Sequence, residues 1–104
     1  MVNFRMERLN RELLRLLSEM LEFEVKDEVA REAVLLSVDC SPDLSSALVY
    51  FTLLDEEDAP RVEEALERVS TFLRRELGKR MRIRTVPRLN FKYGRRSALG
   101  SSDL

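Results

Sequence analysis

The sequence predicts a single α+β domain in which helices pack on one face of a three-stranded sheet. Two segments carry apolar residues at helical spacing, and three shorter segments carry them at alternate positions. The length of 104 residues suffices for one two-layer core but not for two. The expected order is helix, hairpin, a long or broken helix, and a final strand, which defines this class.

Residues 4–24 predict the first helix, with Asn3 as its N-cap. One helical face collects the apolar residues Met6, Leu9, Leu13, Leu16, Leu17 and Met20. Arg8, Arg11 and Arg15 fall roughly opposite that face. Two interpretations of these arginines stay open: a solvated face paired with neighbouring glutamates, or a contact with a polyanion.

Residues 30–60 predict a hairpin with its turn at Pro42-Asp43. Alternation predicts two core-facing sets, which are Val34, Leu36, Val38 and Cys40 on the first strand and Ala47, Val49, Phe51 and Leu53 on the second.

A second helix is expected to start near Ala59, after the acidic run 55–58 that suits the positive end of a helix dipole. Its predicted buried stripe is Val62, Ala65, Leu66, Val69, Leu73 and Leu77. Gly78 is the expected stop. Ser70 and Thr71 weaken the helix and predict a bend there.

After Gly78 the apolar period changes to two. Met81, Ile83, Leu89, Phe91 and Tyr93 take odd positions, while Arg82, Arg84, Arg88 and Lys92 take even ones. A strand here would bury one face and display a basic row on the other. Pro87 lacks an N–H and marks an edge position or a break in that strand.

Charge is divided sharply along the chain. Residues 1–73 hold 8 basic and 17 acidic side chains, whereas residues 74–96 hold 10 basic side chains and one acid, Glu76. A concentrated positive segment attracts polyanions even though the net charge is only −1. Nucleic acid is the favoured partner, because each phosphate that Lys or Arg neutralises releases counterions. The competing interpretation is a solvated surface balanced by the acidic remainder.

The sequence offers little for catalysis. It contains no His, only three glycines and a single cysteine, Cys40, which is expected to be a small buried or edge hydrophobe. The acidic run 55–58 is far more typical of a solvated helix start than of a metal site. We therefore predict no enzyme activity, no cofactor, no metal and no small-molecule substrate. No apolar run reaches membrane-spanning length and the N-terminus lacks a signal-peptide pattern, so no membrane contact and a cytoplasmic location are expected.

Three stretches resemble one protein family in the same order and spacing. They are "NFRMERLNRELLRLLSEML", "LLSVDCSPDLSSALVYFTLL" and "FLRRELGKRMRIRTVPRLNFKYG". The last is the most specific, since it is similar to that family's Leu-Arg-x-x-Leu followed by Leu-Arg-x-x-Pro-x-Leu-x-Phe. The chain resembles bacterial ribosome-binding factor A, a small-subunit assembly factor, over nearly its full length.

The resemblance implies a type II KH-like domain, α-β-β-α-(kink)-α-β, over residues 1–96, with a tail over 97–104. It implies binding to the free 30S subunit, assistance to late maturation of 16S rRNA including its 5′-end region, and a role in cold adaptation. The protein is expected to be a monomer. Two alternatives remain: a KH-like module that acts on non-ribosomal RNA, and a domain that recognises an acidic protein.

The candidate RNA-binding residues follow from the charge pattern. They are Arg8, Arg15, Arg74, Arg75, Lys79, Arg80, Arg82, Arg84, Arg88, Lys92, Arg95 and Arg96. Stacking of bases on Phe91 or Tyr93 is not expected, because both are predicted on the core side. The family bends its second helix at an Ala-x-Gly element, for which this chain has Val69, Ser70 and Thr71. Gly94 stands where the family commonly has Asp.

Overall fold

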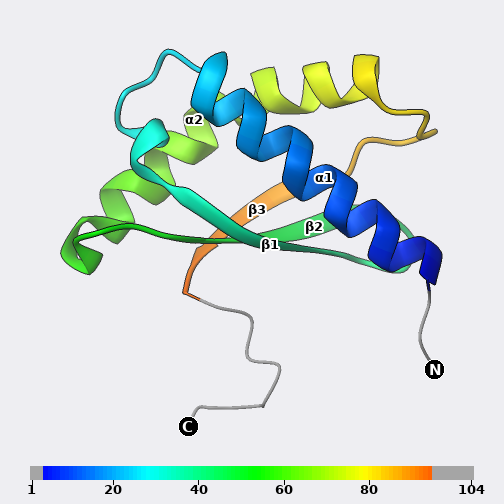
Figure 1. Ribbon diagram of the computed structural model, residues 1–104, viewed down its shortest axis with the longest axis horizontal. Coiled ribbons are helices and arrows are strands. Elements are labelled where there is room, and N and C mark those ends of the chain that lie inside the picture. The colour runs from blue at the N-terminus through cyan, green and yellow to red at the C-terminus, as the bar shows by residue number, and fades with distance from the viewer. Residues whose placement is uncertain (1–3, 95–104) are drawn as a thin grey trace, which may run out of the picture.

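The computed structural model describes residues 4–94 as one sheet of three strands with two helices on the same side (Figure 1). The elements are α1 (Phe4–Phe23), β1 (Val34–Cys40), β2 (Ser46–Thr52), α2 (Ala59–Arg80) and β3 (Arg88–Tyr93), with 3₁₀ turns at Ala30–Glu32 and Glu56–Asp58. The strand order is β1-β2-β3, with β1 antiparallel and β3 parallel to β2. The α+β class and the two-layer packing are therefore confirmed.

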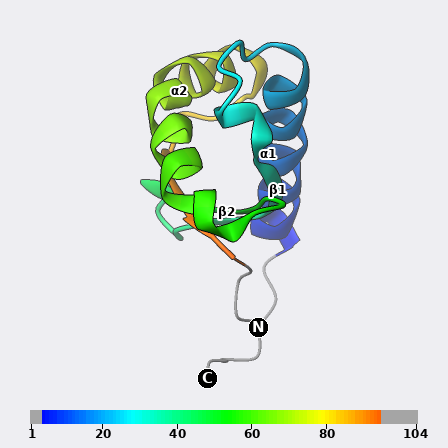
Figure 2. The same ribbon diagram turned by 90° about the vertical axis from the view of Figure 1, so that its left-hand side faces the viewer.

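The two helices divide the covered face of the sheet between them. α1 packs on β1, and α2 packs on β3, so that the core lies between the helices and the central strand (Figure 2). Leu13, Leu17 and Met20 are completely buried, as the helical spacing predicts. The Asn10 side chain fixes α1 on the sheet, because its Oδ1 accepts a hydrogen bond of 3.0 Å from the amide of Cys40. The predicted N-cap, Asn3, lies outside the described residues.

A β-bulge changes the first strand from its predicted pattern. The register with β2 shifts between Leu35 and Ser37, so Leu36 has no paired residue opposite it. Leu35 packs against the core, while Val34 is 58% exposed. The prediction that Val34 and Leu36 face the core is wrong, because the extra residue reverses the alternation on the N-terminal side of the bulge. Val38 and Cys40, beyond the bulge, are buried as predicted.

The hairpin turn is held by one carboxylate. Asp43 Oδ1 accepts hydrogen bonds from the amide and hydroxyl of Ser45, at 3.0 and 2.8 Å, and from the Ser41 hydroxyl at 2.8 Å. These bonds lower the pKa of Asp43. Leu44 follows in the left-handed region, at φ 62°, and its side chain packs against the core. The structure confirms the predicted position of the turn at Pro42-Asp43.

A second carboxylate orders the connection between α1 and β1. Asp27 Oδ1 accepts from the amides of Ala30 and Val29 at 3.1 and 3.0 Å, and Oδ2 pairs with Arg68 of α2 at 3.2 Å. These contacts lower the pKa of Asp27, and the hydrogen bond from the amide of Ala30 has the largest effect. Partial burial of the carboxylate opposes the shift.

Replacing Asp27 by Asn is expected to destabilise the protein in a pH-dependent way. Since folding lowers this pKa, the ionised carboxylate stabilises the fold at neutral pH. That contribution is complete above the pKa that Asp27 has in the unfolded chain. It is lost as the pH falls through the lower pKa that Asp27 has in the folded protein. Urea unfolding at about pH 7 and about pH 3 should show a larger deficit for Asp27→Asn at the higher pH. An equal deficit at both values would contradict a charge-based role.

The second helix runs further than predicted. α2 begins at Ala59 as expected, but it continues through Gly78 to Arg80. A Cβ at position 78 would lie 3.4 Å from Cγ2 of Val86, an ordinary van der Waals contact, so Gly78 lies within the helix beside the following loop and does not end the helix. The hydrogen-bonded helix is uninterrupted, and its axis changes direction along its length (Figures 1 and 2). The predicted second and third helices are thus one bent helix.

The last strand is shorter than predicted. β3 begins only at Arg88, and residues 81–87 form a loop. Met81 and Ile83 are therefore not strand residues, and Arg82 and Arg84 belong to the loop. Pro87 is buried immediately before the strand and marks the break. Gly94 ends β3 at φ 108°, with its amide donating to the carbonyl of Phe51 at 2.9 Å. An Asp at this position would require a backbone conformation that side chains disfavour.

Candidate nucleic-acid interface

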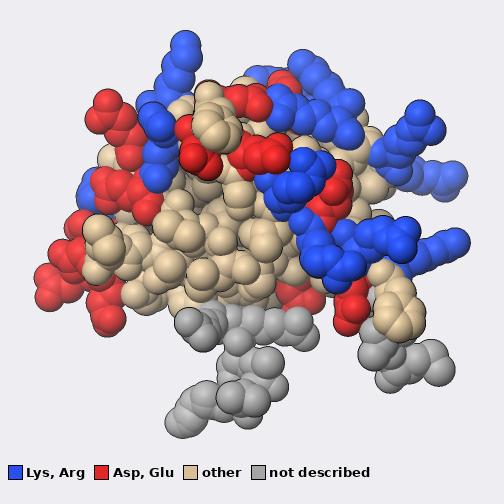
Figure 3. All heavy atoms as spheres, viewed as in Figure 1, with Lys and Arg blue, Asp and Glu red and all other residues tan. Residues whose placement is uncertain are grey.

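Positive and negative side chains gather at different ends of the molecule. Figure 3 shows most of the visible Lys and Arg over the end where α1 begins and α2 finishes, and a cluster of Asp and Glu at the opposite end; some Lys and Arg also lie above that cluster, and a few acids lie among the cations. The acidic run Asp55–Asp58 precedes α2 on the acidic side, where Asp55 caps its own turn by accepting from the amide of Glu57 at 3.0 Å. The charge division along the sequence is therefore also a division in space.

The basic end contains a groove that we call the arginine groove. It lies between the N-terminal half of α1 and the loop after α2, with a volume of about 370 Å³. Its lining residues are Arg5, Arg8, Leu9, Glu12, Arg80, Met81, Arg82 and Ile83. The lining therefore consists of four arginines, three apolar side chains and one acid. Arg5 was missed by the sequence reasoning, because nothing in the sequence brings the start of α1 next to residues 80–83.

Arg80 is less available than the other groove arginines. Its guanidinium donates to Glu24 at 2.8 Å and to Glu76 at 3.1 Å. The bond to Glu24 and then the bond to Glu76 raise the pKa of Arg80, and the same pairing lowers the pKa of Glu24. Arg80 therefore joins the end of α1 to the end of α2, and its charge is largely balanced.

Two other candidate residues are also paired. Arg15 bonds Glu12 at 2.8 Å and Glu19 at 3.2 Å on the same helix. This agrees with the paired-face interpretation for Arg15, and it also lowers the pKa of Glu12. Lys79 bonds Glu76 at 3.4 Å. By contrast, Arg8, Arg82 and Arg84 form no ion pair within residues 4–94.

Arg74 supports the loop that forms one wall of the groove. Its Nε donates to the carbonyl of Pro87 at 3.1 Å and its Nη2 to that of Val86 at 3.0 Å. The neighbouring Arg75 makes no such bond and lies over the Phe72 ring at 5.8 Å. Arg74 therefore has a structural contact that the sequence did not reveal.

Replacing Arg74 by Ala is expected to lower the free energy of unfolding by about 1–2 kcal/mol, because two loop carbonyls lose their donor. The matched variant Arg75→Ala removes the same charge one residue further along the same helix. It should cost about 0.5 kcal/mol or less. Chemical denaturation of both variants measures the difference. Equal losses would show that the carbonyl bonds contribute nothing beyond charge.

Arg88 and Lys92 lie on another surface. Both side chains are exposed on β3, while Leu89 and Phe91 between them are buried against α2. They therefore project from the face of the sheet that the helices leave uncovered, in register with Ser46 and Tyr50 of β2. The predicted basic segment therefore does not form one surface: Arg80 and Arg82 line the arginine groove, whereas this sheet-face pair lies on the uncovered face. Arg95 and Arg96 lie outside the described residues.

The aromatic residues of β3 are not available for stacking. Phe91 is 4% exposed, and the Tyr93 ring packs edge-on against Phe51 with centroids 5.8 Å apart. This confirms their expected position on the core side. Tyr50, which is half-buried on the uncovered face beside Lys92, is the nearest aromatic residue to that cation by register.

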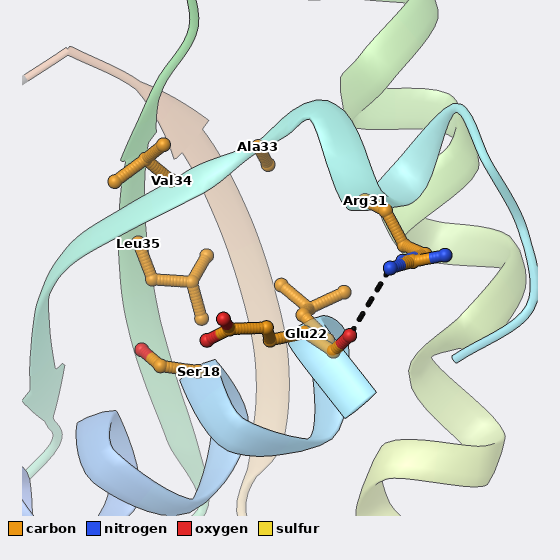
Figure 4. A pocket seen from close by; sticks show the side chains of 7 residues that line it. Ser18, Glu22, Arg31, Ala33, Val34 and Leu35 are labelled. Carbon is orange, nitrogen blue, oxygen red and sulfur yellow. Dashed lines mark hydrogen bonds between the residues drawn. The ribbon is translucent and has the colours of Figure 1, made fainter. Parts of the chain in front are cut away.

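A second hollow, of about 280 Å³, lies between α1 and β1 (Figure 4). Its lining includes Ser18, Glu22, Arg31 and Val34. Arg31 is its one cation, and that guanidinium donates to the Glu22 carbonyl at 3.2 Å. With an acid beside an engaged cation, this hollow does not suit a phosphate group.

Within residues 4–94 no cluster of three or more His, Cys, Asp or Glu side chains could hold a metal ion. Cys40 is buried. This burial, and to a lesser extent the negative charge of nearby Asp39, raises the pKa of its thiol. None of the described helices combines the length and apolar character needed to cross a bilayer.

Fold and surface together define a small α+β domain with a basic groove suited to nucleic-acid phosphates. Residues 5–101 match the family model "Ribosome-binding factor A", and the chain belongs to that family. It is 43% identical to ribosome-binding factor A of Azoarcus sp. strain BH72 over 93% of this chain and 78% of that protein. It is 44% identical to the one from Thioalkalivibrio sulfidiphilus strain HL-EbGR7, over 86% of this chain and 70% of that protein.

Solved structures give the same result. The crystal structure of ribosome-binding factor A from Thermus thermophilus superimposes with a TM-score of 0.75 at 30% identity, covering 85% of this chain and 93% of that one. A homology model of the Thermus thermophilus protein, fitted into a cryo-EM map of its complex with the 30S subunit, gives 0.66 at 31% identity, covering 84% and 92%.

Proposed function

We propose that this protein is a ribosome assembly factor that binds the free 30S subunit and contacts 16S rRNA through the arginine groove. The observation that carries the proposal is the segregation of charge, which leaves Arg8 and Arg82, both in the lining of one groove, without acidic partners among the described residues. Family membership supports it, and the Thermus thermophilus relative has been fitted into a map of a 30S complex.

The finer parts of the proposal rest on the resemblance. They are assistance to late maturation of 16S rRNA, including its 5′-end region, and support of growth in the cold. We also propose that the protein acts as a cytoplasmic monomer without catalysis, cofactor or small-molecule substrate. The type II KH-like classification belongs here too, with Val69, Ser70 and Thr71 proposed as the element at which α2 bends.

Co-sedimentation tests the function. The purified protein is spun with free 30S subunits and, separately, with whole ribosomes, at low and high salt. Selective binding to free 30S subunits that weakens as salt rises is the expected result, because phosphate contacts release counterions. Equal binding to 30S subunits, whole ribosomes and naked non-ribosomal RNA would overturn the assembly-factor proposal in favour of a general RNA-binding module. Saturable binding to an acidic protein that survives nuclease treatment would overturn RNA binding itself.

A further inference from the structure

We propose that the arginine groove takes one unpaired nucleotide, with its base against the apolar floor and its flanking phosphates on the arginines at the rim. This inference rests on the proposed function and deepens it, because it names the form of RNA that the groove recognises. The carrying observation is the combination of an apolar floor and unpaired cations in one hollow.

The floor is apolar and accessible. Leu9, Met81 and Ile83 line the groove and are only partly buried. Leu9 and Met81 also pack against the core, so the floor is supported from below. An apolar floor adds nothing to the binding of phosphates. The face of a base, in contrast, binds more tightly when it packs against apolar side chains and leaves water. The volume of about 370 Å³ falls within the range of small-ligand sites.

The rim supplies cations on both sides. Arg5 and Arg8 come from α1, and Arg82 comes from the facing loop. The one acid of the lining, Glu12, is bonded to Arg15 at 2.8 Å, so its charge is offset. Arginines on two opposite walls can hold the phosphates that precede and follow one nucleotide, since the planar guanidinium donates to two phosphate oxygens at once.

A duplex cannot use the floor. Its bases are paired and stacked inside, and it presents phosphates and sugars to a protein surface. Duplex RNA would reach the rim arginines only, whereas a single strand can turn one base inward. The groove should therefore prefer single-stranded RNA. The sheet-face pair Arg88 and Lys92 does not line this groove, so it takes no part in this discrimination.

Fluorescence anisotropy with two RNA probes tests the inference. One probe is a short single-stranded RNA with a terminal fluorophore, and the other is the blunt duplex of the same sequence. The variant is Ile83→Ala, because Ile83 lines the groove without packing against the buried core. The matched control is Leu54→Ala, which truncates a fully exposed apolar residue outside the groove.

The intact protein should bind the single strand more tightly than the duplex. Ile83→Ala should weaken single-strand binding about fivefold and leave duplex binding unchanged, and Leu54→Ala should change neither. A single strand carrying 4-thiouridine should also cross-link to the peptide that contains Met81 and Ile83. If Ile83→Ala changes neither probe while Arg8→Glu weakens both, the base site is refuted and the proposed phosphate contact stands. If neither variant changes either probe, both the base site and the proposed function at this groove are refuted.

Discussion

Replacing Arg8 and Arg82 together by Glu is expected to weaken binding to the 30S subunit about a hundredfold at low salt. Both residues line the arginine groove, from opposite walls, and neither has an ion-pair partner within residues 4–94. The reversal removes two phosphate contacts and adds two repulsive charges. The slope of log affinity against log salt should also become shallower, by about 0.7 per lost contact for single-stranded RNA.

The matched control is the double variant Arg88→Glu and Lys92→Glu. It changes the net charge by the same amount, on the uncovered face of the sheet. We expect it to weaken binding less than about fivefold, because these two side chains lie outside the groove and remove no proposed phosphate contact. Equal losses in the two variants would show that overall charge, and not the groove, determines binding.

Arg80 should not be part of this experiment. Its guanidinium lies between Glu24 and Glu76, and a carboxylate introduced there would face two acids. Such a variant would lose binding through damage to the junction of α1 and α2. Circular dichroism spectra and thermal unfolding of the Arg8/Arg82 variant should match those of the intact protein, which separates a binding defect from a folding defect.

The sequence predicts the helices and the hairpin well because their signals are local. Helical spacing of Leu13, Leu17 and Met20, and alternation of Ala47, Val49 and Phe51, each follow from one element that buries one face. The same spacing does not reveal the bulge after Leu35, because alternation of apolar residues continues through 34–40.

The alternating segment 81–84 resembles a strand for a different reason. A strand needs a partner, and β2 begins at Ser46, which already pairs with Arg88 at the start of β3. Residues before Arg88 have no strand beside them, so they form a loop although their apolar residues alternate. The position of a neighbouring strand is a tertiary fact that the pattern does not contain.

The candidate interface was predictable as a region but not as a set of contacts. Clustering of cations in 74–96 correctly indicated a basic surface. However, the availability of each arginine depends on distant residues, such as Glu24, which lies 56 positions from Arg80. Pro87 also separates two groups of cations. Arg80 and Arg82, before it, line the arginine groove, whereas Arg88 and Lys92, after it, lie on β3 and face away from the helices.

Replacing Phe51 by Ala should destabilise the protein by about 3–5 kcal/mol. Phe51 is completely buried on the central strand, where it pairs with Leu35 of β1 and Tyr93 of β3. Its ring forms a T-shaped pair with Tyr93, so truncation removes an aromatic pair as well as apolar contacts. A domain of this size has roughly 5–15 kcal/mol of total stability, so the loss is a large part of it.

Urea unfolding measures this change, with Leu54→Ala as the control. Leu54 is fully exposed, so its truncation should alter the free energy of unfolding by about 0.5 kcal/mol or less. Phe51→Leu should fall between the two, because it keeps most of the apolar volume but loses the ring contact. If Phe51→Ala cost as little as Leu54→Ala, the core would tolerate a cavity at its centre.

Because the Phe51 carbonyl also accepts from Gly94, loosening this strand would release the end of β3 as well. The sheet-face cations would then lose their position while the arginine groove, built from α1 and the loop after α2, would be affected only through global unfolding.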